Sequence, residues 1–163
     1  MSDSEPLHYR SAAELAASIK RRELAVTELM DVSLARIETV NAQVNAIISL
    51  DAEAARDTAK TFDEQRKDIG DKPLYGLPIA IKDLVLTKGI RTTFGSPIYR
   101  DFVPDIDELI VSRLKEAGAI VIGKTNVPEF GAGSQTFNTV FGATRNPYDL
   151  SKTCGGSSGG AAV

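Results

Sequence analysis

The sequence contains one cysteine and one histidine among its 163 residues, and this scarcity excludes several kinds of site. A lone cysteine, Cys154, cannot form an internal disulfide framework or a metal site built from cysteines. The lone histidine, His8, argues against a Ser-His-Asp triad, and a Cys–His pair would need the N-terminal segment to fold across to Cys154. Without a second histidine, and with acidic residues scattered over predicted helical faces, no metal site is expected. A lysine or a carboxylate remains as the base near neutral pH.

The sequence also lacks an excess of positive charge, because its formal net charge is -3. Nucleic-acid-binding domains are normally basic, so no nucleic-acid partner is expected. The cluster Lys20-Arg21-Arg22 is a local exception that closes a predicted helix, where cations suit the helix dipole. No apolar run approaches the length of a membrane span, and the polar opening Met1–Arg10 lacks the apolar segment of a signal peptide. We therefore expect a cytoplasmic protein without a membrane partner.

The chain length suits a single domain, whose first part, residues 1–71, is predicted to be a helical layer. Ser11 and Glu14 have the spacing of a capping box, which predicts that a helix begins after Ser11. Further helices are predicted at about 27–40 and 52–67, with a short strand at 46–48 between them. A turn at 69–73 ends this layer.

The second part, residues 72–163, is predicted to begin an α/β core. Pro78–Ile81 is a short apolar run suited to a strand, and Ala119–Ile122 is predicted to be the next strand. Between them, Asp107 is expected to cap a helix that reaches Ala117 and stops at Gly118. This order predicts part of a mixed sheet covered by helices. Residues 123–163 are rich in Gly, Asn, Thr and Ser, which is typical of a site rather than a core.

Lys82 is a candidate general base because it emerges from an apolar strand. Burial disfavours the charged form of a lysine and lowers its pKa, and the neutral amine can accept a proton. The alternative is an ordinary lysine at a strand end, which reaches water and pairs with Asp83.

The glycine- and serine-rich run Gly155–Gly160 is the second candidate. Its spacing fits the first part of a phosphate-binding loop, but Ala161 and Ala162 stand where that loop needs lysine and Ser/Thr. A flexible linker is the alternative, although the apolar residues that follow favour the start of a buried helix. If a helix begins there, its free N–H groups and the glycines would form a pocket for a developing negative charge. Catalysis by a serine with a lysine as its base is therefore the simplest hypothesis for this site.

Motifs that include these candidates resemble the amidase signature family, and the resemblance covers nearly the whole chain. The motifs occur in the family's order and at fitting intervals, and this combination is specific for the family. The motifs are Gly76-Leu77-Pro78-Ile79-Ala80-Ile81-Lys82-Asp83, Gly123-Lys124-Thr125-Asn126-Val127-Pro128-Glu129-Phe130, Gly142-Ala143-Thr144-Arg145-Asn146-Pro147-Tyr148-Asp149 and Gly155-Gly156-Ser157-Ser158-Gly159-Gly160.

The resemblance implies a catalytic group of two serines and a lysine. Lys82 would be the general base, and Ser157 would be the bridging serine, which relays a proton between the lysine amine and the nucleophilic serine and later to the leaving amine. Gly155 and Gly156 would permit a cis peptide bond between Gly156 and Ser157 that aims the Ser157 hydroxyl at both partners. Ser158 would support the site rather than take part in the chemistry.

In the family, the nucleophilic serine and its oxyanion-hole amides lie further along the chain than the bridging serine. Only six residues follow Ser157 in this sequence, and the last of them, Ala161–Val163, form an apolar run without a helix stop signal. We therefore expect residues 1–163 to be the N-terminal part of a single amidase signature domain that needs the remainder of its polypeptide, and to be inactive alone.

Within the family, Val127–Thr136 is more similar to stand-alone amidases than to the amidotransferase subunit that charges tRNA with glutamine. That subunit more often has Met-Asp-Glu-Phe at residues 127–130, and asparagine where this chain has Leu84. Gly131 and Gly133 would then lie along the acyl pocket.

The implied function is hydrolysis of a small-molecule carboxylic amide to the acid and ammonia or an amine, through a serine acyl-enzyme and without a cofactor. Two alternatives stay open. One is a glutamine-hydrolysing subunit of a tRNA-dependent amidotransferase, which would need a partner protein, and the other is an inactive fragment or binding module. A homodimer is compatible with the sequence, which carries no signal of oligomeric state.

Overall fold

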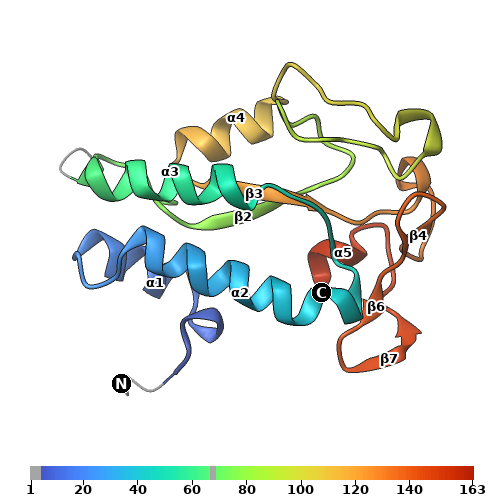
Figure 1. Cartoon of the computed structure of the whole chain (residues 1–163), viewed down its shortest axis with the longest axis horizontal. Coiled ribbons are helices and arrows are strands. Elements are labelled where there is room, and N and C mark those ends of the chain that lie inside the picture. Colours follow the sequence, from blue (N-terminus) through green and yellow to red (C-terminus); the bar gives the residue numbers. More distant parts are fainter. Residues whose placement is uncertain (1–4, 67–68) are drawn as a thin grey trace.

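A three-stranded mixed sheet lies between helices in the computed structural model, which describes residues 5–66 and 69–163 (Figure 1). The strand order is β1 (Ile47–Leu50), β3 (Ile120–Thr125) and β2 (Pro78–Lys82). β1 runs antiparallel to β3, and β2 runs parallel to it. The predicted mixed sheet covered by helices is therefore confirmed, and its central strand, β3, joins a strand from residues 1–71 to one from residues 72–163.

Helix α1 (Ala12–Lys20) begins as the capping box predicts. The Ser11 hydroxyl accepts a hydrogen bond from the Glu14 backbone N–H at 3.3 Å, and the Glu14 carboxylate accepts one from the Ser11 backbone N–H at 3.0 Å. Leu15 and Ile19 of α1 are buried in the apolar core. The capping box thus orients α1 so that one face packs on the core.

Helix α2 (Val26–Val44) is longer than predicted at both ends. It stops at Asn45, which adopts the left-handed conformation at a φ of 53° and donates its backbone N–H to the Asn41 carbonyl at 2.7 Å. Asparagine tolerates this conformation better than most residues, so the stop signal is Asn45 rather than the expected end near Val40.

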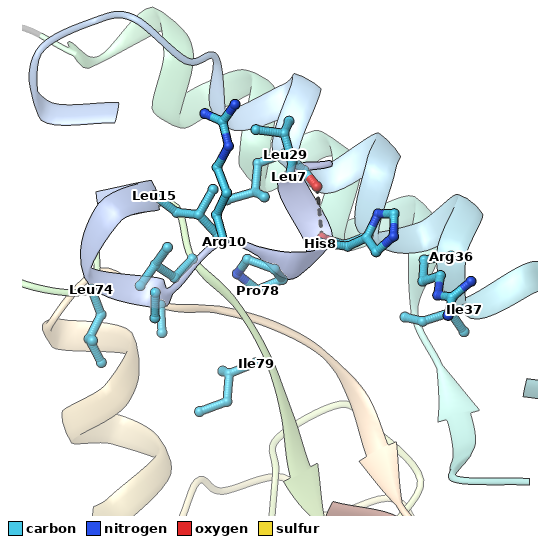
Figure 2. Close-up of a pocket in the computed structure, with 14 residues that line it drawn as sticks. Leu7, His8, Arg10, Leu15, Leu29, Arg36, Ile37, Leu74, Pro78 and Ile79 are labelled. Carbon is cyan, nitrogen blue, oxygen red and sulfur yellow. Dashed lines mark hydrogen bonds between the residues drawn. The ribbon is translucent and has the colours of Figure 1, made fainter. Parts of the chain in front are cut away.

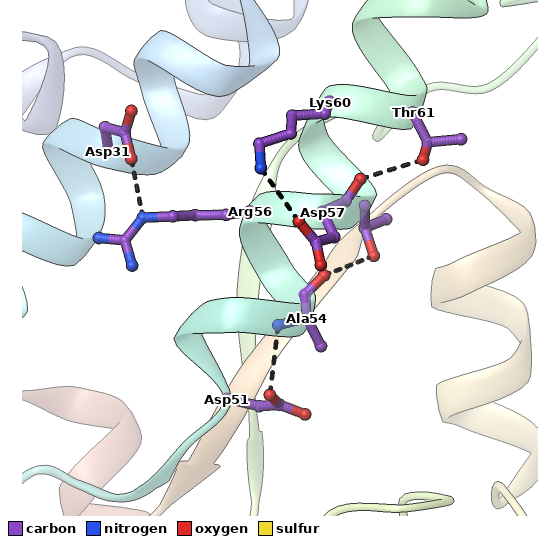
Figure 3. Close-up of polar contacts among 8 residues, drawn as sticks. Asp31, Asp51, Ala54, Arg56, Asp57, Lys60 and Thr61 are labelled. Atoms are coloured by element: carbon purple, nitrogen blue, oxygen red, sulfur yellow. Dashed lines mark hydrogen bonds and ion pairs between the residues drawn. The ribbon is translucent and has the colours of Figure 1, made fainter.

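Helix α3 (Ala52–Glu64) packs between α2 and β3. Asp51 caps it through the Ala54 backbone N–H, and Arg56 of α3 forms an ion pair of 3.0 Å with Asp31 of α2 (Figure 3). The helix was predicted to reach residue 67, but it ends at Glu64, and Lys67 lies outside the described residues.

Helix α4 (Leu109–Glu116) begins after Glu108, so the prediction that Asp107 caps it was wrong. The Asp107 carboxylate instead accepts hydrogen bonds from the Lys88 backbone N–H and from Lys115 Nζ, both at 2.7 Å. Gly118 ends the helical region as predicted, at a φ of +95°. A side chain there would collide with the Tyr75 backbone, so glycine permits both the turn and the close approach.

The region after β3 is mostly irregular, as the composition predicted, and carries short hairpins. One hairpin pairs β4 (Phe137–Asn138) with β5 (Gly142–Ala143), and another pairs β6 (Arg145–Asn146) with β7 (Asp149–Thr153). Helix α5 (Gly159–Ala162) follows and contacts β2 and β3. Short 3-10 helices occur at η1 (Leu7–Tyr9), η3 (Pro97–Tyr99) and η4 (Glu129–Gly131).

The apolar core gathers between α1, α2, α3 and the N-terminal halves of β2 and β3, and its residues are buried hydrophobic side chains. They include Leu15, Ile19, Leu24, Val26, Leu29, Met30, Leu34, Ala55, Ala59, Tyr75, Leu77, Ile120 and Ile122.

No helix within residues 5–66 and 69–163 combines the length and the apolar character needed to cross a bilayer.

Asp63 of α3 caps the neighbouring helix α2 across the core. The α2 N-cap position, Ala25, has no side chain able to accept a hydrogen bond. Asp63 supplies the acceptor by binding the backbone N–H groups of Val26 and Thr27 at 2.9 and 3.0 Å, and Arg66 Nε donates to the same carboxylate at 2.7 Å. Burial by itself raises the pKa of Asp63, but these hydrogen bonds and the Arg66 charge outweigh it and hold the pKa below its usual value.

We predict that Asp63→Asn lowers the free energy of unfolding by about 1–2 kcal/mol at pH 7, because charge-assisted hydrogen bonds to a helix N-terminus are lost. A lowered folded pKa adds stability above the unfolded aspartate pKa of about 3.9, and this stability is lost as pH falls through the folded pKa. The difference between wild type and variant should therefore shrink below about pH 4. Denaturant unfolding at several pH values measures it.

The matched control is Asp57→Asn, which removes from the same helix an exposed carboxylate that forms an ion pair with Lys60 (Figure 3). It should change stability little, because exposed ion pairs contribute little. Equal losses in the two variants would contradict the capping role of Asp63.

Candidate active site

Lys82 is the last residue of β2, and its side chain reaches the serine pair before α5. Its Nζ atom donates hydrogen bonds of 2.9 Å to Ser157 Oγ and 2.9 Å to Ser158 Oγ. These groups are 75 and 76 residues apart in the sequence. The structure thus brings together the predicted base, the predicted bridging serine and the predicted supporting serine.

The alternative in which Lys82 pairs with Asp83 does not occur. The Asp83 side chain is fully buried and accepts hydrogen bonds from the Thr93 backbone N–H at 3.1 Å and from Thr93 Oγ1 at 2.6 Å. Successive residues of a strand point to opposite faces, so Lys82 and Asp83 are directed apart. Lys82 itself is half-buried, on the face that carries Ser157.

The backbone around the serine pair is anchored by Thr136. The Thr136 backbone N–H donates to the Gly155 carbonyl at 2.9 Å, and its hydroxyl accepts from the Gly159 N–H at 3.1 Å. The peptide bond between Gly156 and Ser157 is cis, as the resemblance predicted. Thr136 therefore holds the loop on both sides of Ser157, a role that was not anticipated from the sequence.

Two glycines let the serine loop come close to neighbouring backbone. A Cβ atom on Gly156 would lie 3.0 Å from the backbone of Gln135. One on Gly160 would collide with the Asn126 N atom and the Ala46 carbonyl oxygen, and the Gly160 N–H donates to the Asn126 carbonyl at 3.2 Å. The loop is thereby pressed against the end of β3, which positions Ser157 opposite Lys82.

Helix α5 begins directly after the serine pair, as the apolar residues there predicted. Its N-cap residue, Ser158, makes no side-chain capping bond, and the Ser158 hydroxyl accepts a hydrogen bond from Lys82. The predicted pocket for a developing negative charge at this point stays a prediction.

Gly131 and Gly133 lie in the segment that leads to the serine loop. Gly131 packs against Leu84, two residues beyond Lys82, where a Cβ atom would approach the Leu84 side chain to 2.6 Å. Gly133 lines a pocket of about 430 Å³ formed by residues between Pro128 and Thr139. The segment that carries both glycines therefore packs near the site, and their role in acyl binding stays a prediction.

Cys154 and His8 are not brought together. Burial raises the pKa of the Cys154 thiol, which disfavours the reactive thiolate. His8 lies in η1, 4.4 Å from the Tyr9 ring, and borders an apolar pocket of about 440 Å³ between the N-terminal segment, α2 and the start of β2 (Figure 2). Within the described residues, no group of His, Cys, Asp and Glu side chains could hold a metal ion.

Lys124 is a buried lysine whose importance the sequence analysis missed. Its side chain is fully buried in β3, and burial lowers its pKa to about 8, while Asp83, Glu108 and Asp107 oppose the shift. Burial likewise raises the pKa of Asp83, against the influence of Thr93 and of Lys124. The signal was a lysine directly after the apolar run Ile120–Ile122 and Gly123.

Thr125, the register partner of Lys82, carries a buried hydroxyl that has no hydrogen-bond partner within the part of the chain described. Register partners of parallel strands share a face, so Thr125 lies on the Lys82 side of the sheet.

Comparisons with known proteins identify the family. A family model described as Amidase matches residues 28–163. A glutamyl-tRNA(Gln) amidotransferase subunit from Syntrophobacter fumaroxidans is 46% identical over 150 residues, which cover 92% of this chain and 31% of that protein. The structure of peptide amidase from Stenotrophomonas maltophilia is similar at a TM-score of 0.86 and 34% identity, covering 95% of this chain and 33% of that one.

A bacterial aryl acylamidase of the amidase signature family is similar at a TM-score of 0.89 and 29% identity, covering 96% of this chain and 33% of that one. The chain thus spans about a third of the length of the relatives it matches.

We predict that Gly160→Ala lowers Tm by several degrees, because overpacking against rigid backbone costs about 1–3 kcal/mol. The control is Gly142→Ala, where nothing lies within 4 Å but φ is +82°. The Gly142→Ala variant should lose only the stability that a left-handed backbone conformation costs an alanine. A Tm loss for Gly160→Ala no greater than that of the control, measured by circular dichroism, would contradict the close approach.

Proposed function

The chain belongs to the amidase family, and on that basis we propose that the protein hydrolyses a carboxylic amide to the acid and ammonia or an amine through a serine acyl-enzyme. The observation that carries the proposal is the hydrogen bond of 2.9 Å between Lys82 Nζ and Ser157 Oγ. A lysine amine in contact with a serine hydroxyl is a chain along which a proton can move. We also propose that residues 1–163 are the first part of one amidase domain, with a helical layer at 1–71 and the start of the α/β core at 72–163.

In the proposed mechanism, neutral Lys82 is the general base and Ser157 is the bridging serine. Lys82 accepts the Ser157 proton while Ser157 accepts the proton of the nucleophilic serine, whose oxygen forms a bond to the amide carbonyl carbon. The proton then returns through Ser157 to the leaving nitrogen as the C–N bond breaks. Water releases the acid from the acyl-enzyme by the same relay in reverse.

The nucleophilic serine is proposed to come from the remainder of the polypeptide. The family resemblance assigns that role to a serine further along than Ser157. Ser158, which also accepts a hydrogen bond from Lys82, would hold the amine in place rather than attack the substrate.

A second candidate is a glutamine-hydrolysing subunit of a tRNA-dependent amidotransferase. The observation that favours it is the 46% identity to the amidotransferase subunit from Syntrophobacter fumaroxidans, compared with 34% to the peptide amidase. The residues at 127–130 and Leu84 favour the stand-alone amidase instead. In the second candidate the protein would work with a charged tRNA and a partner protein. The expectation of no nucleic-acid partner would then mean only that the surface of this chain does not itself bind the tRNA.

We predict that Lys82→Ala lowers kcat of the full-length protein by about 10²–10⁴-fold, because the proton relay loses its base. Lys82→Arg should not restore activity, since a guanidinium stays protonated. The control is Lys88→Ala, which removes an exposed lysine six positions further along. Near-normal turnover of Lys82→Ala or Lys82→Arg on the best amide substrate would remove Lys82 from the mechanism.

We predict that a fluorophosphonate probe labels one serine of the full-length protein, and that labelling slows in Ser157→Ala because the relay is broken. Intact-mass and peptide mass spectrometry measure the adduct. Absence of any serine adduct would favour the non-catalytic alternative. Release of ammonia from glutamine, compared with aryl and aliphatic amides and with or without the other amidotransferase subunits, separates the two enzymatic candidates.

A further inference from the structure

The loop that follows Lys82, residues 83–96, is tied to β3 by the buried ammonium group of Lys124. Lys124 Nζ donates hydrogen bonds of 2.5 Å to the Val85 carbonyl, 2.9 Å to Thr87 Oγ1 and 3.0 Å to Thr92 Oγ1. An ammonium group has three N–H donors, so this loop satisfies all of them. The side chains of Lys124, Thr87 and Thr92 are fully buried.

Lys124 lies on the opposite face of the sheet from the serine site. In the parallel pairing, Ile81 is the register partner of Lys124, and Lys82 is the register partner of Thr125. Because side chains alternate between the two faces, Lys124 points away from Lys82 and Ser157. Any effect of Lys124 on the site must therefore pass through the backbone that carries Lys82.

That backbone is fixed at several points around Lys82. The Asp83 N–H donates to the Thr125 carbonyl at 3.1 Å, and the Asp83 carbonyl accepts from the Phe94 N–H at 3.0 Å. The Asp83 carboxylate binds Thr93 on the same buried face as Lys124. The loop therefore leaves β2 at Asp83, wraps the Lys124 ammonium and returns to Asp83 through residues 92–94.

We propose that Lys124 is a positioning residue for Lys82, which holds the 83–96 loop so that Lys82 Nζ stays within hydrogen-bond distance of Ser157. The proposal rests on the proposed function, in which Lys82 is the base. A charged group can stay buried only while its hydrogen-bond partners are in place, so the three acceptors and the end of β2 are ordered together. With a pKa of about 8, Lys124 is mostly charged at neutral pH, and the buried Asp83 carboxylate and the nearby Glu108 and Asp107 complement that charge.

The test uses the full-length protein with Lys124→Met, which keeps an unbranched side chain of similar length but removes the charge and the donors. Misplacement of a catalytic group by about 1 Å reduces rate by about 100-fold, so kcat should fall by about that factor while KM changes little. Amide hydrogen exchange should accelerate across residues 83–96. All kinetics are measured at temperatures where circular dichroism shows each variant folded.

Asp63→Asn is the matched control, because it alters the partly buried carboxylate that pairs with Arg66 and caps α2 from α3, away from the serine site. It should lower Tm but leave kcat and the exchange of residues 83–96 as in the wild type. Thr92→Val removes one hydrogen-bond acceptor of Lys124 while preserving the shape of the side chain and the charges of Lys124 and Asp83. It should lower kcat by about tenfold, which corresponds to the loss of about one hydrogen bond. This variant decides the question if Lys124→Met does not fold.

Wild-type kcat and unchanged exchange of residues 83–96 in folded Lys124→Met or Thr92→Val would overturn the positioning role. If those variants behave so while Lys82→Ala is inactive, the proposed function stands and only the positioning role fails. If Lys82→Ala retains activity, the proposed role of Lys82 as base fails and the positioning role fails with it, while the exchange measurement alone still shows whether Lys124 orders the loop.

Discussion

The parallel pairing of β2 with β3 is the constraint on which the rest of the site depends. It places the end of β2 beside the end of β3, so that Lys82 and Thr125 are register partners. Directly after Thr125, the backbone carbonyl of Asn126 accepts a hydrogen bond from the Gly160 N–H. One strand pair therefore determines where the lysine emerges and where the serine loop comes to rest against it.

The two ends of this strand pair have different interiors. Toward the N-terminal ends of β2 and β3, the core is apolar and is formed with α1, α2 and α3. Toward their C-terminal ends it is polar: Asn126, Asn138 and Thr144 form a buried network, in which Asn126 Nδ2 donates to Thr144 Oγ1 at 3.0 Å and Asn138 Nδ2 donates to Asn126 Oδ1 at 2.8 Å. Apolar side chains can be exchanged for others of similar volume at little loss of stability, whereas hydrogen bonds require particular distances and angles. The polar end is thus the part of the molecule suited to holding catalytic groups in a fixed geometry.

Local sequence signals predicted those parts of the structure that local chemistry decides. The capping box at Ser11, the stop at Gly118 and the strand that ends in Lys82 were all readable, because each depends on residues a few positions apart. The role of Asp107 was misread because two carboxylates, Asp107 and Glu108, stand at the helix start and both bind the backbone of residues 86–88 instead. That choice depends on a loop about twenty residues away, which no local pattern describes.

The predicted catalytic residues came from motifs that resemble a known family, and the structure brings Lys82, Ser157 and Ser158 into contact. The supporting residues Thr136 and Lys124 were not predicted. Thr136 has no distinguishing context in a segment rich in polar residues, and its contacts are made with glycines some twenty positions away. Lys124 could have been noticed as a charge soon after an apolar run, but its acceptors become apparent only when the loop after β2 is folded over it.

The separation of Lys82 and Ser157 along the chain bears on the order in which the molecule folds. Their contact closes a loop of 75 residues, and such closure carries an entropic penalty that earlier, more local contacts must offset. Helices α1 to α3 and the pairing of β2 with β3 involve shorter separations and bury most of the apolar core. The serine loop can dock only on a β3 end that is already in place, so the site is expected to assemble late, after the scaffold that fixes its lysine.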